Sequence, residues 1–264
     1  MTSFSHPLED TWNIPEPQKE GINNNTNEVE LTNKSYPIIV SFDGNIGSGK
    51  SSVVKYFQNN FDKYCKSKNK NLKICFLQEP VTEWESIKDI DDGKNVIEKF
   101  YEDNKSYSFS FQMMAYISRL AIFKKAINEN YDVIFTERSM FTDKNVFAKM
   151  LYDSKQMRSI DYQIYNKWFD EFVDIIKNIK TVYVRTSPEV CQSRIIKRKR
   201  LGENIPFDYL QNCHYYHEVW LNCLEKIEEG NVLIINGNEE TNTSIIIENN
   251  YYDNIIANVF NFMF

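Results

Sequence analysis

The feature that most constrains this chain is a glycine-rich octet, Gly44-Asn45-Ile46-Gly47-Ser48-Gly49-Lys50-Ser51. It follows the apolar run 38–42 and opens the segment 52–57, which has the pattern of a helix. A G-x-x-x-x-G-K-[ST] phosphate loop requires this context of strand, loop and helix. The glycines let successive backbone N–H groups converge on one point, and the helix N-terminus adds its positive dipole end. The octet therefore predicts a site that holds the phosphates of a nucleotide.

Two residues of this loop have separate expected roles. Lys50 is expected to reach the β- and γ-phosphates of ATP, and the Ser51 hydroxyl is placed to bind Mg²⁺. As a loop lysine, Lys50 is also expected to contribute little packing. The donor-binding residues predicted here are Gly44, Asn45, Ile46, Gly47, Ser48, Gly49, Lys50, Ser51 and Ser52.

Length, charge and cysteine usage exclude several classes of protein. A chain of 264 residues can bury a large core. Its net charge of −6 does not suggest binding to nucleic acid or to a membrane surface. No run approaches the roughly 18 apolar residues of a membrane span. The five cysteines are scattered and include no C-x-x-C pair, which fits a reducing compartment and excludes a cysteine zinc site.

Residues 1–35 differ in composition from the rest of the chain. They contain Asn23-Asn24-Asn25, three prolines and few large apolar residues, and acidic residues outnumber lysines. We interpret them as a disordered tail and residues 36–264 as the folded domain. The tail has neither the arginines of a mitochondrial presequence nor the apolar stretch of a secretory signal, so the expected location is the cytoplasm.

After Tyr36, short apolar runs alternate with long helical patterns. The expected strands are 38–43, 72–77, 132–136, 181–185 and 231–235. The expected helices are 51–66, 95–129, 145–178, 188–201, 206–229 and 245–262. This alternation predicts an α/β fold with a parallel five-stranded sheet flanked by helices. In such folds ligands bind at the carboxyl ends of the strands.

Charged residues follow the second and third expected strands. Glu79, fixed by Pro80, could act as a general base that activates a sugar hydroxyl, or it could be a solvated loop carboxylate. Glu137 and Arg138 end the third strand. Glu137 could bind Mg²⁺, and Arg138 could hold substrate and base, with a structural ion pair as the alternative.

The basic run Arg194-Ile195-Ile196-Lys197-Arg198-Lys199-Arg200 follows the fourth strand. Taken alone, it has the composition of a nuclear localisation signal or a nucleic-acid patch. After a helix start at Ser187, and in a phosphate-loop fold, it is better explained as an arginine-rich lid over the transferring phosphoryl group. His214 and His217 resemble a metal pair, but helix packing or a lid contact is favoured because only one other histidine is present.

Together these residues resemble the deoxynucleoside kinase family over nearly all of 37–235. The resemblance rests on the phosphate loop, on Glu79-Pro80-Val81 with Trp84, and on Glu137-Arg138-Ser139 followed by Asp143. It extends to Asn95-Val96, Tyr101, Ser110-Phe111-Gln112, Arg185-Thr186-Ser187-Pro188-Glu189, Arg194, Arg198, Arg200, Glu203, Ile205-Pro206, Tyr209-Leu210, His214, His217-Glu218 and Trp220-Leu221. The loop between Glu203 and Pro206 is one residue shorter than the family pattern.

The resemblance implies a P-loop kinase fold and a role for each matched residue. Glu79 would take the proton of a 5′-hydroxyl, with Arg138 beside it, and Tyr101 and Glu203 would hold the 3′-hydroxyl. Gln112 would bind the base edge between walls made by Trp84 and Phe111. The donor phosphates would be closed in by Arg194, Arg198 and Arg200. Segment 236–240 falls, with a weak match, where the family forms its donor-base loop. The family also implies a homodimer built through the long helices.

The pair Arg119 and Asp143 bears on substrate choice. In the resemblance it occupies the pocket of deoxycytidine and deoxyguanosine kinases, where thymidine-accepting relatives carry small or apolar residues. We therefore expect ATP-dependent 5′-phosphorylation of a deoxynucleoside with a purine base preferred, deoxyguanosine or deoxyadenosine. A deoxycytidine-preferring kinase is the alternative.

More distant alternatives fit less well. A nucleoside monophosphate kinase such as thymidylate kinase would need extra arginines around the acceptor, where this chain offers Glu79, Tyr101 and Gln112. A GTPase-type regulator would need Asp-x-x-Gly and Asn-Lys-x-Asp motifs, and neither is present. A nucleic-acid binder conflicts with the acidic balance and leaves the phosphate loop unexplained.

Overall fold

A computed structural model describes residues 36–264, except residues 177, 200–204 and 240–244. The expected tail, residues 1–35, lies outside the described residues. Residues 38–236 contain five strands that form one parallel sheet in the order β2-β3-β1-β4-β5. The strands are β1 (Ile38–Asp43), β2 (Ile74–Leu77), β3 (Val133–Glu137), β4 (Ile179–Arg185) and β5 (Val232–Asn236). The parallel α/β fold expected from the sequence is confirmed.

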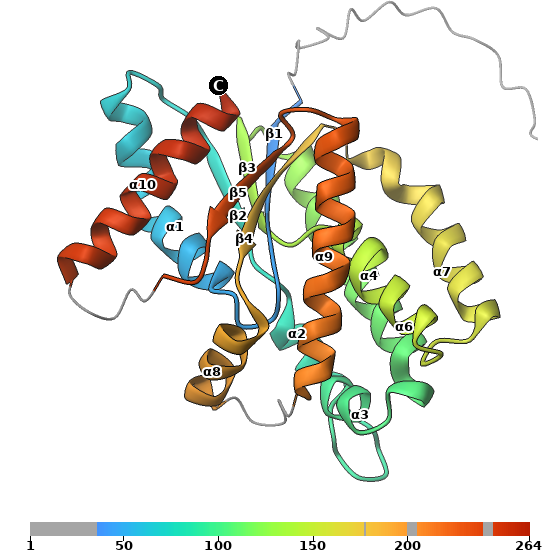
Figure 1. The fold of residues 1–264 in the computed structure, drawn as a ribbon. Helices are drawn as coiled ribbons and strands as arrows, with labels where there is room; N and C mark the ends of the chain where they lie inside the picture. The colour runs from blue at the N-terminus through green and yellow to red at the C-terminus, as the bar shows by residue number, and fades with distance from the viewer. Residues whose placement is uncertain (1–35, 177, 200–204, 240–244) are drawn as a thin grey trace, which may run out of the picture. The chain divides into compact units, whose positions relative to one another are not determined.

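Helices cover both faces of this sheet (Figure 1). The α-helices are α1 (Lys50–Ser67), α2 (Val81–Ser86), α3 (Val96–Glu102), α4 (Asn104–Asn128), α5 (Met140–Thr142), α6 (Lys149–Asp153), α7 (Ser159–Phe172), α8 (Pro188–Arg198), α9 (Phe207–Ile227) and α10 (Ile245–Met263). A π-helix, η1 (Asp143–Ala148), follows α5, and a 3₁₀ turn, η2 (Val173–Ile175), follows α7.

The core has two main parts, one on each face of the sheet. Helices α1 and α10 bury Phe57, Phe61 and Ile256 against one face. Helices α4 and α7 bury Tyr116, Tyr165 and their neighbours against the other. The strands carry apolar side chains toward both layers, which explains why they read as continuous apolar runs in the sequence.

Two long helices expected from the sequence are interrupted. The stretch 95–129 divides at Asp103, whose side chain accepts a hydrogen bond from the Ser106 N–H and so caps α4. The stretch 145–178 divides at a turn in which Lys155 has a left-handed backbone, φ 63°. Both breaks use short-range capping and turn geometry that periodicity alone does not reveal.

Strand β1 lies at the centre of the sheet, between β3 and β4. The chain order reverses on either side of β1, so the loop after this strand opens into a crevice at the carboxyl edge of the sheet. The glycine-rich octet occupies this position. None of the helices in the described part of the chain combines the length and apolar character needed to cross a membrane.

Candidate active site

The phosphate loop joins β1 to α1, as the sequence predicts. Gly44 and Gly47 both have positive φ, 148° and 78°. A Cβ atom at Gly44 would lie 2.6 Å from the Val184 carbonyl oxygen, and one at Gly47 would lie 2.6 Å from that of Cys191. A side chain at either position would therefore displace the loop from β4 or α8.

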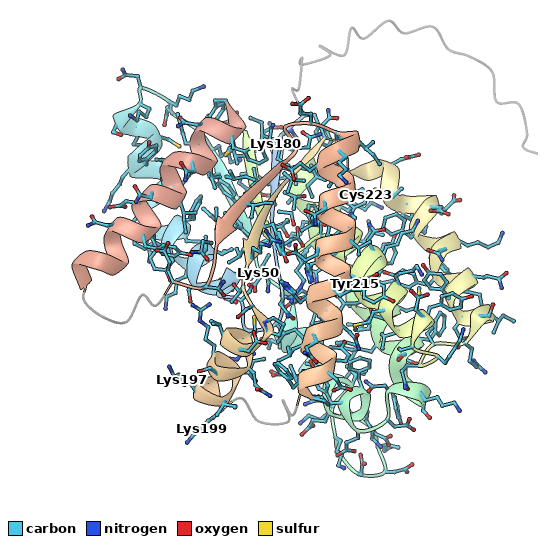
Figure 2. The ribbon with its side chains drawn as sticks, in the orientation of Figure 1. Lys50, Lys180, Lys197, Lys199, Tyr215 and Cys223 are labelled. Atoms are coloured by element: carbon cyan, nitrogen blue, oxygen red, sulfur yellow. The ribbon has the colours of Figure 1, made fainter. Side chains whose placement is uncertain are left out.

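Lys50 begins α1 and points back into the loop, between the sheet and α8 (Figure 2). Its Nζ donates to the carbonyl oxygens of Gly44 at 3.0 Å and Asn45 at 2.7 Å. The expectation that Lys50 packs little is wrong, since its side chain is buried by the loop that it stabilises. Burial, together with the charge of Arg138, lowers the pKa of Lys50 to about 8.

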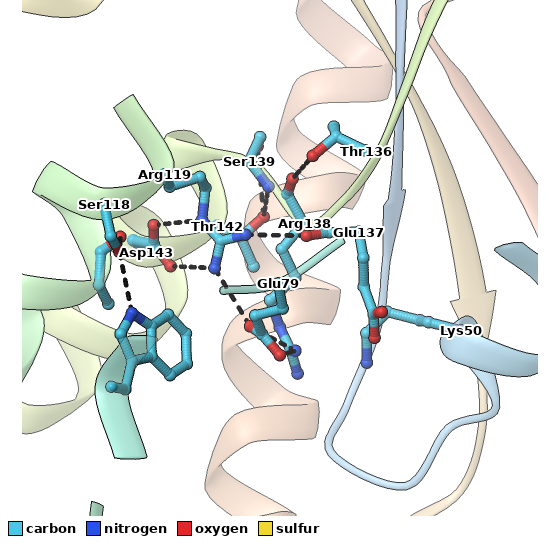
Figure 3. Close-up of polar contacts among 12 residues, drawn as sticks. Lys50, Glu79, Ser118, Arg119, Thr136, Glu137, Arg138, Ser139, Thr142 and Asp143 are labelled. Atoms are coloured by element: carbon cyan, nitrogen blue, oxygen red, sulfur yellow. Dashed lines mark hydrogen bonds and ion pairs between the residues drawn. The ribbon is translucent and has the colours of Figure 1, made fainter. Parts of the chain in front are cut away.

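Glu79 follows β2 and lies between two arginines (Figure 3). Arg138 Nη1 lies 3.1 and 3.2 Å from its two carboxylate oxygens, and Arg119 Nη2 lies 3.1 Å from Oε1. Burial would raise the pKa of Glu79, but the charges of Arg138, Arg119 and Lys50 outweigh burial and lower it to about 2. Glu79 is therefore an ionised carboxylate at neutral pH.

Arg119 lines the cavity and contacts three acidic residues, two through their carboxylates and one through its backbone carbonyl group. Its Nε lies 2.9 Å from Asp143 Oδ2, its Nη1 donates to the Glu137 carbonyl oxygen at 2.8 Å, and its Nη2 bonds Glu79. Burial would lower the pKa of Arg119, but Asp143 and Glu79 raise it. The Arg119–Asp143 pair expected from the sequence is therefore formed, and it also holds Glu79, which the sequence did not indicate.

Ser51 and Glu137, the two candidate Mg²⁺ ligands, lie together. The Ser51 hydroxyl donates to Glu137 Oε1 at 2.7 Å, and both residues line the same cavity. Among the described residues, no group of three His, Cys, Asp or Glu forms a metal cage. One hydroxyl and one carboxylate still fit Mg²⁺, because this ion commonly completes its octahedron with water and phosphate oxygens.

A cavity of about 720 Å³ runs from the phosphate loop to α3 and α4. Trp84 and Phe111 meet edge to face at 5.6 Å and form one wall, and Trp84 Nε1 donates to Ser118 at 2.9 Å. Gln112 extends into this part of the cavity, and its Oε1 is buried without a hydrogen-bond partner. Tyr101 also lines the cavity. The described acceptor residues expected from the sequence thus come together, while Glu203 lies outside the described residues.

Helix α8 contains those arginines of the expected lid that the structure describes, up to Arg198. Arg194 Nη1 donates to the Ser48 carbonyl oxygen in the phosphate loop at 3.0 Å, and Arg198 lines the cavity. Arg200 and Glu203 lie outside the described residues. The basic run therefore faces the donor end of the cavity at Arg194 and Arg198.

Several cavity residues were given no role from the sequence. Phe147 packs under the Arg138 guanidinium, 5.1 Å from its ring centre, and Tyr209, which matched the family pattern without a stated role, is a partly buried residue of α9 that lines the cavity. Tyr251 and Tyr252 of α10 line the donor end. Phe147 lies in a π-helix, for which the sequence has no signal. Tyr251 and Tyr252 lie outside the motifs quoted above and reach the cavity through the packing of α10.

The two histidines of α9 lie in different surroundings. His217 is buried, and its Nδ1 lies 2.7 Å from the Cys213 carbonyl oxygen. Its ring stacks on Tyr183. His214 Nε2 lies 3.9 Å from Glu218. Helix packing, one of the two roles expected for these histidines, is confirmed for His217.

A phosphate loop facing an ionised carboxylate held by two arginines defines a phosphotransferase that acts on a small acceptor. Comparison with known proteins agrees, because residues 40–263 match the family model of the deoxynucleoside kinases. The chain belongs to the deoxynucleoside kinase family, as its motifs indicated. The family match therefore favours a nucleoside kinase over the monophosphate kinase considered from the sequence.

Individual relatives support this assignment. The chain is 33% identical over 229 residues to a probable deoxycytidine kinase of Fowlpox virus, across 85% of this chain and 87% of that protein. It is 31% identical over 218 residues to the deoxycytidine kinase of Mus musculus, across 76% and 84%. It is 30% identical over 189 residues to mitochondrial thymidine kinase 2 of Macaca fascicularis, across 69% and 64%.

Proposed function

We propose that this kinase transfers the γ-phosphoryl group of ATP to the 5′-hydroxyl of a deoxynucleoside, and that residues 36–264 form the catalytic domain. The observation that carries the proposal is the placement of Glu79 between Arg119 and Arg138 in the cavity that the phosphate loop closes. The five cysteines are all free, which supports a reducing compartment such as the cytoplasm.

In this mechanism Glu79 is the general base. It accepts the proton of the 5′-hydroxyl as the hydroxyl oxygen bonds to the γ-phosphorus, and the bond to the ADP leaving group breaks. A pKa of about 2 keeps Glu79 ionised before the reaction, and Arg138 stabilises this charge. The two arginines also fix the direction of the carboxylate.

The donor phosphates are held by the phosphate loop, by Lys50 and by the arginines of α8. Lys50 already donates to two loop carbonyl groups, so its ammonium is held at the loop before ATP binds. Ser51 and Glu137 would hold Mg²⁺, which supplies charge neutralisation on the phosphate oxygens. Arg194 and Arg198, together with Arg200, would contact the donor when it is bound.

The acceptor sugar and base occupy the other end of the cavity. We assign the 3′-hydroxyl to Tyr101 and Glu203, and the base edge to Gln112 between Trp84 and Phe111. The unpaired, buried Oε1 of Gln112 supports this, because a buried acceptor needs a donor such as a base amino group. A neutral nucleoside suits this end of the cavity, where aromatic rings and one amide lie beside the Arg119–Asp143 pair, whose opposite charges offset each other.

For base preference we propose a purine, deoxyguanosine or deoxyadenosine. The buried Arg119–Asp143 pair lines the cavity. We expect it to narrow the space that the 5-methyl group of thymine needs and to offer polar partners to other bases. The second candidate is deoxycytidine, which is favoured by the names of the viral and mouse relatives. Steady-state phosphorylation of the four deoxynucleosides with ATP tests both, and an enzyme that phosphorylates none of them would refute the proposed function.

The double substitution Arg119→Met with Asp143→Ala is expected to raise kcat/KM for thymidine relative to purines by about 10-fold, which corresponds to about 1.4 kcal/mol. Both residues are replaced together because a single substitution would leave the other member of the buried ion pair charged and unpaired. Total activity should fall, because Arg119 also bonds Glu79. The measurement is therefore the ratio of kcat/KM values between substrates.

Lys144→Ala with Asp170→Ala is the matched control, since this ion pair lies outside the cavity. This control variant should leave the ratio of kcat/KM for thymidine to kcat/KM for purine deoxynucleosides unchanged. A wild-type enzyme that prefers thymidine, or an unchanged ranking in the Arg119/Asp143 variant, would refute the proposed role of the pair.

We also propose that the enzyme is a homodimer that pairs through α4 and α7. Ile160, Ile164 and Trp168 recur at four-residue spacing along α7 and are exposed, with Ile164 at 39% and Trp168 at 46%. Ile117 on α4, the neighbouring helix, is also exposed. An apolar stripe of this kind on adjacent helices is typical of an interface with a second copy.

Replacing Ile164 by Lys should weaken the dimer, because a charge would be buried in the apolar interface. Sedimentation equilibrium should show a dimer for the wild type and a shift toward monomer for this variant. Val219→Lys is the control, an exposed apolar position on α9. A monomeric wild type, or equal effects of the two substitutions, would contradict the proposed interface.

A further inference from the structure

Four polar residues lie fully buried behind the site. Ser41, Asp43, Thr136 and Thr142 are each 0% exposed, and none of them lines the cavity. Burying polar groups is unfavourable unless each finds a partner. The hydrogen bonds of these residues therefore show which parts of the chain they hold together.

One of these four residues, Thr136, is bonded to the backbone of Arg138. The Arg138 backbone is left-handed, with φ 63°, a conformation that side chains other than glycine rarely adopt. Its N–H donates to the Phe42 carbonyl oxygen at 3.1 Å, and its carbonyl oxygen accepts from the Thr136 hydroxyl at 2.8 Å. Such a conformation persists only where its surroundings fix it.

A second set of bonds joins the turn after Arg138 to β1. The Thr142 hydroxyl donates to the carboxylate of Asp43. It also accepts from the Ser139 N–H at 3.3 Å, a contact visible in Figure 3. The Ser41 hydroxyl donates to the other oxygen of the same carboxylate. Because Asp43 directly precedes Gly44, one buried carboxylate ties this turn to the start of the phosphate loop.

We propose that Asp43 and Thr142 are positioning residues: their hydrogen bond fixes the Glu137–Ser139 turn against the start of the phosphate loop and so sets how Arg138 meets Glu79. This inference rests on the roles proposed above for Glu79 and Arg138. The donor is held after β1 and the base after β2, so their alignment depends on contacts between elements. A misplacement of about 1 Å can lower the rate of a reaction roughly 100-fold.

Two substitutions at Thr142 test the proposal. Thr142→Val removes the hydroxyl at nearly constant volume, and we expect kcat to fall about 10- to 100-fold. The KM values for deoxynucleoside and ATP should change little, because every group that contacts them is retained. Thr142→Ser keeps the hydroxyl and should restore kcat. Thr181→Val, a buried threonine of β4 outside the main cavity, is the control and should retain kcat.

A hydroxyl that served only stability would give a lower melting temperature with normal kcat in the folded variant, and that result would overturn the inference. If Thr142→Val does not fold, Asp43→Asn replaces it, since an amide cannot accept from both hydroxyls. It should lower kcat at constant KM, and a normal kcat would again overturn the inference. A wild type without kinase activity, or Arg138→Ala with normal kcat, would instead contradict the proposed function.

Discussion

Glu79→Gln is expected to lower kcat about 10²- to 10⁴-fold, because the amide keeps the shape of the side chain but cannot accept the 5′-hydroxyl proton. Binding of the deoxynucleoside should change little, since the aromatic walls and Gln112 remain. Steady-state kinetics with ATP, together with the dissociation constant of the nucleoside, measure the two effects separately.

Glu83→Gln is the matched control for this experiment. Glu83 lies on α2, four residues from Glu79, but it is exposed and does not line the cavity. Its kcat should equal that of the wild type. A Glu79→Gln enzyme that keeps more than about a tenth of wild-type kcat is incompatible with proton transfer of this size, and Glu79 would then not be the base.

Lys50→Ala should abolish the use of ATP at low donor concentration. The ammonium group balances charge on the β- and γ-phosphates during transfer, and alanine offers neither charge nor hydrogen bonds. The loss in kcat/KM for ATP should be about 10²-fold or more, as for the removal of other preorganised donors at developing charge. Because Lys50 also donates to Gly44 and Asn45, the melting temperature should fall slightly.

Lys63→Ala provides the control for charge on the same helix. Lys63 is an exposed residue of α1 that does not line the cavity. The comparison between Lys50→Ala and Lys63→Ala separates the effect of the loop lysine from a general change in helix charge. Normal phosphorylation by Lys50→Ala at low ATP would contradict the assignment of the phosphate loop.

The sequence determined the five strands, most of the helical stretches and the order in which they occur. Strand β1, the glycine loop and α1 were predictable because their signals are local: an apolar run, glycines where φ is positive, and a helical period. Glu79, Glu137 and Arg138 were found because carboxyl ends of parallel strands meet at one edge of a sheet. The basic run after the fourth strand indicated the lid arginines, and the family resemblance then supplied Tyr101 and Gln112.

The tertiary structure decided how these residues interact. That Arg119 bonds Glu79 as well as Asp143, and that Lys50 is buried, depends on packing between helices and strands far apart in the chain. The π-helix that brings Phe147 under Arg138 has no sequence signal, since it differs from an α-helix only in its hydrogen bonds. Local pattern thus determined which groups reach the edge of the sheet, while packing across the sheet set their contacts and the pKa of the proposed base, because burial and the distances between charges exist only in the folded chain.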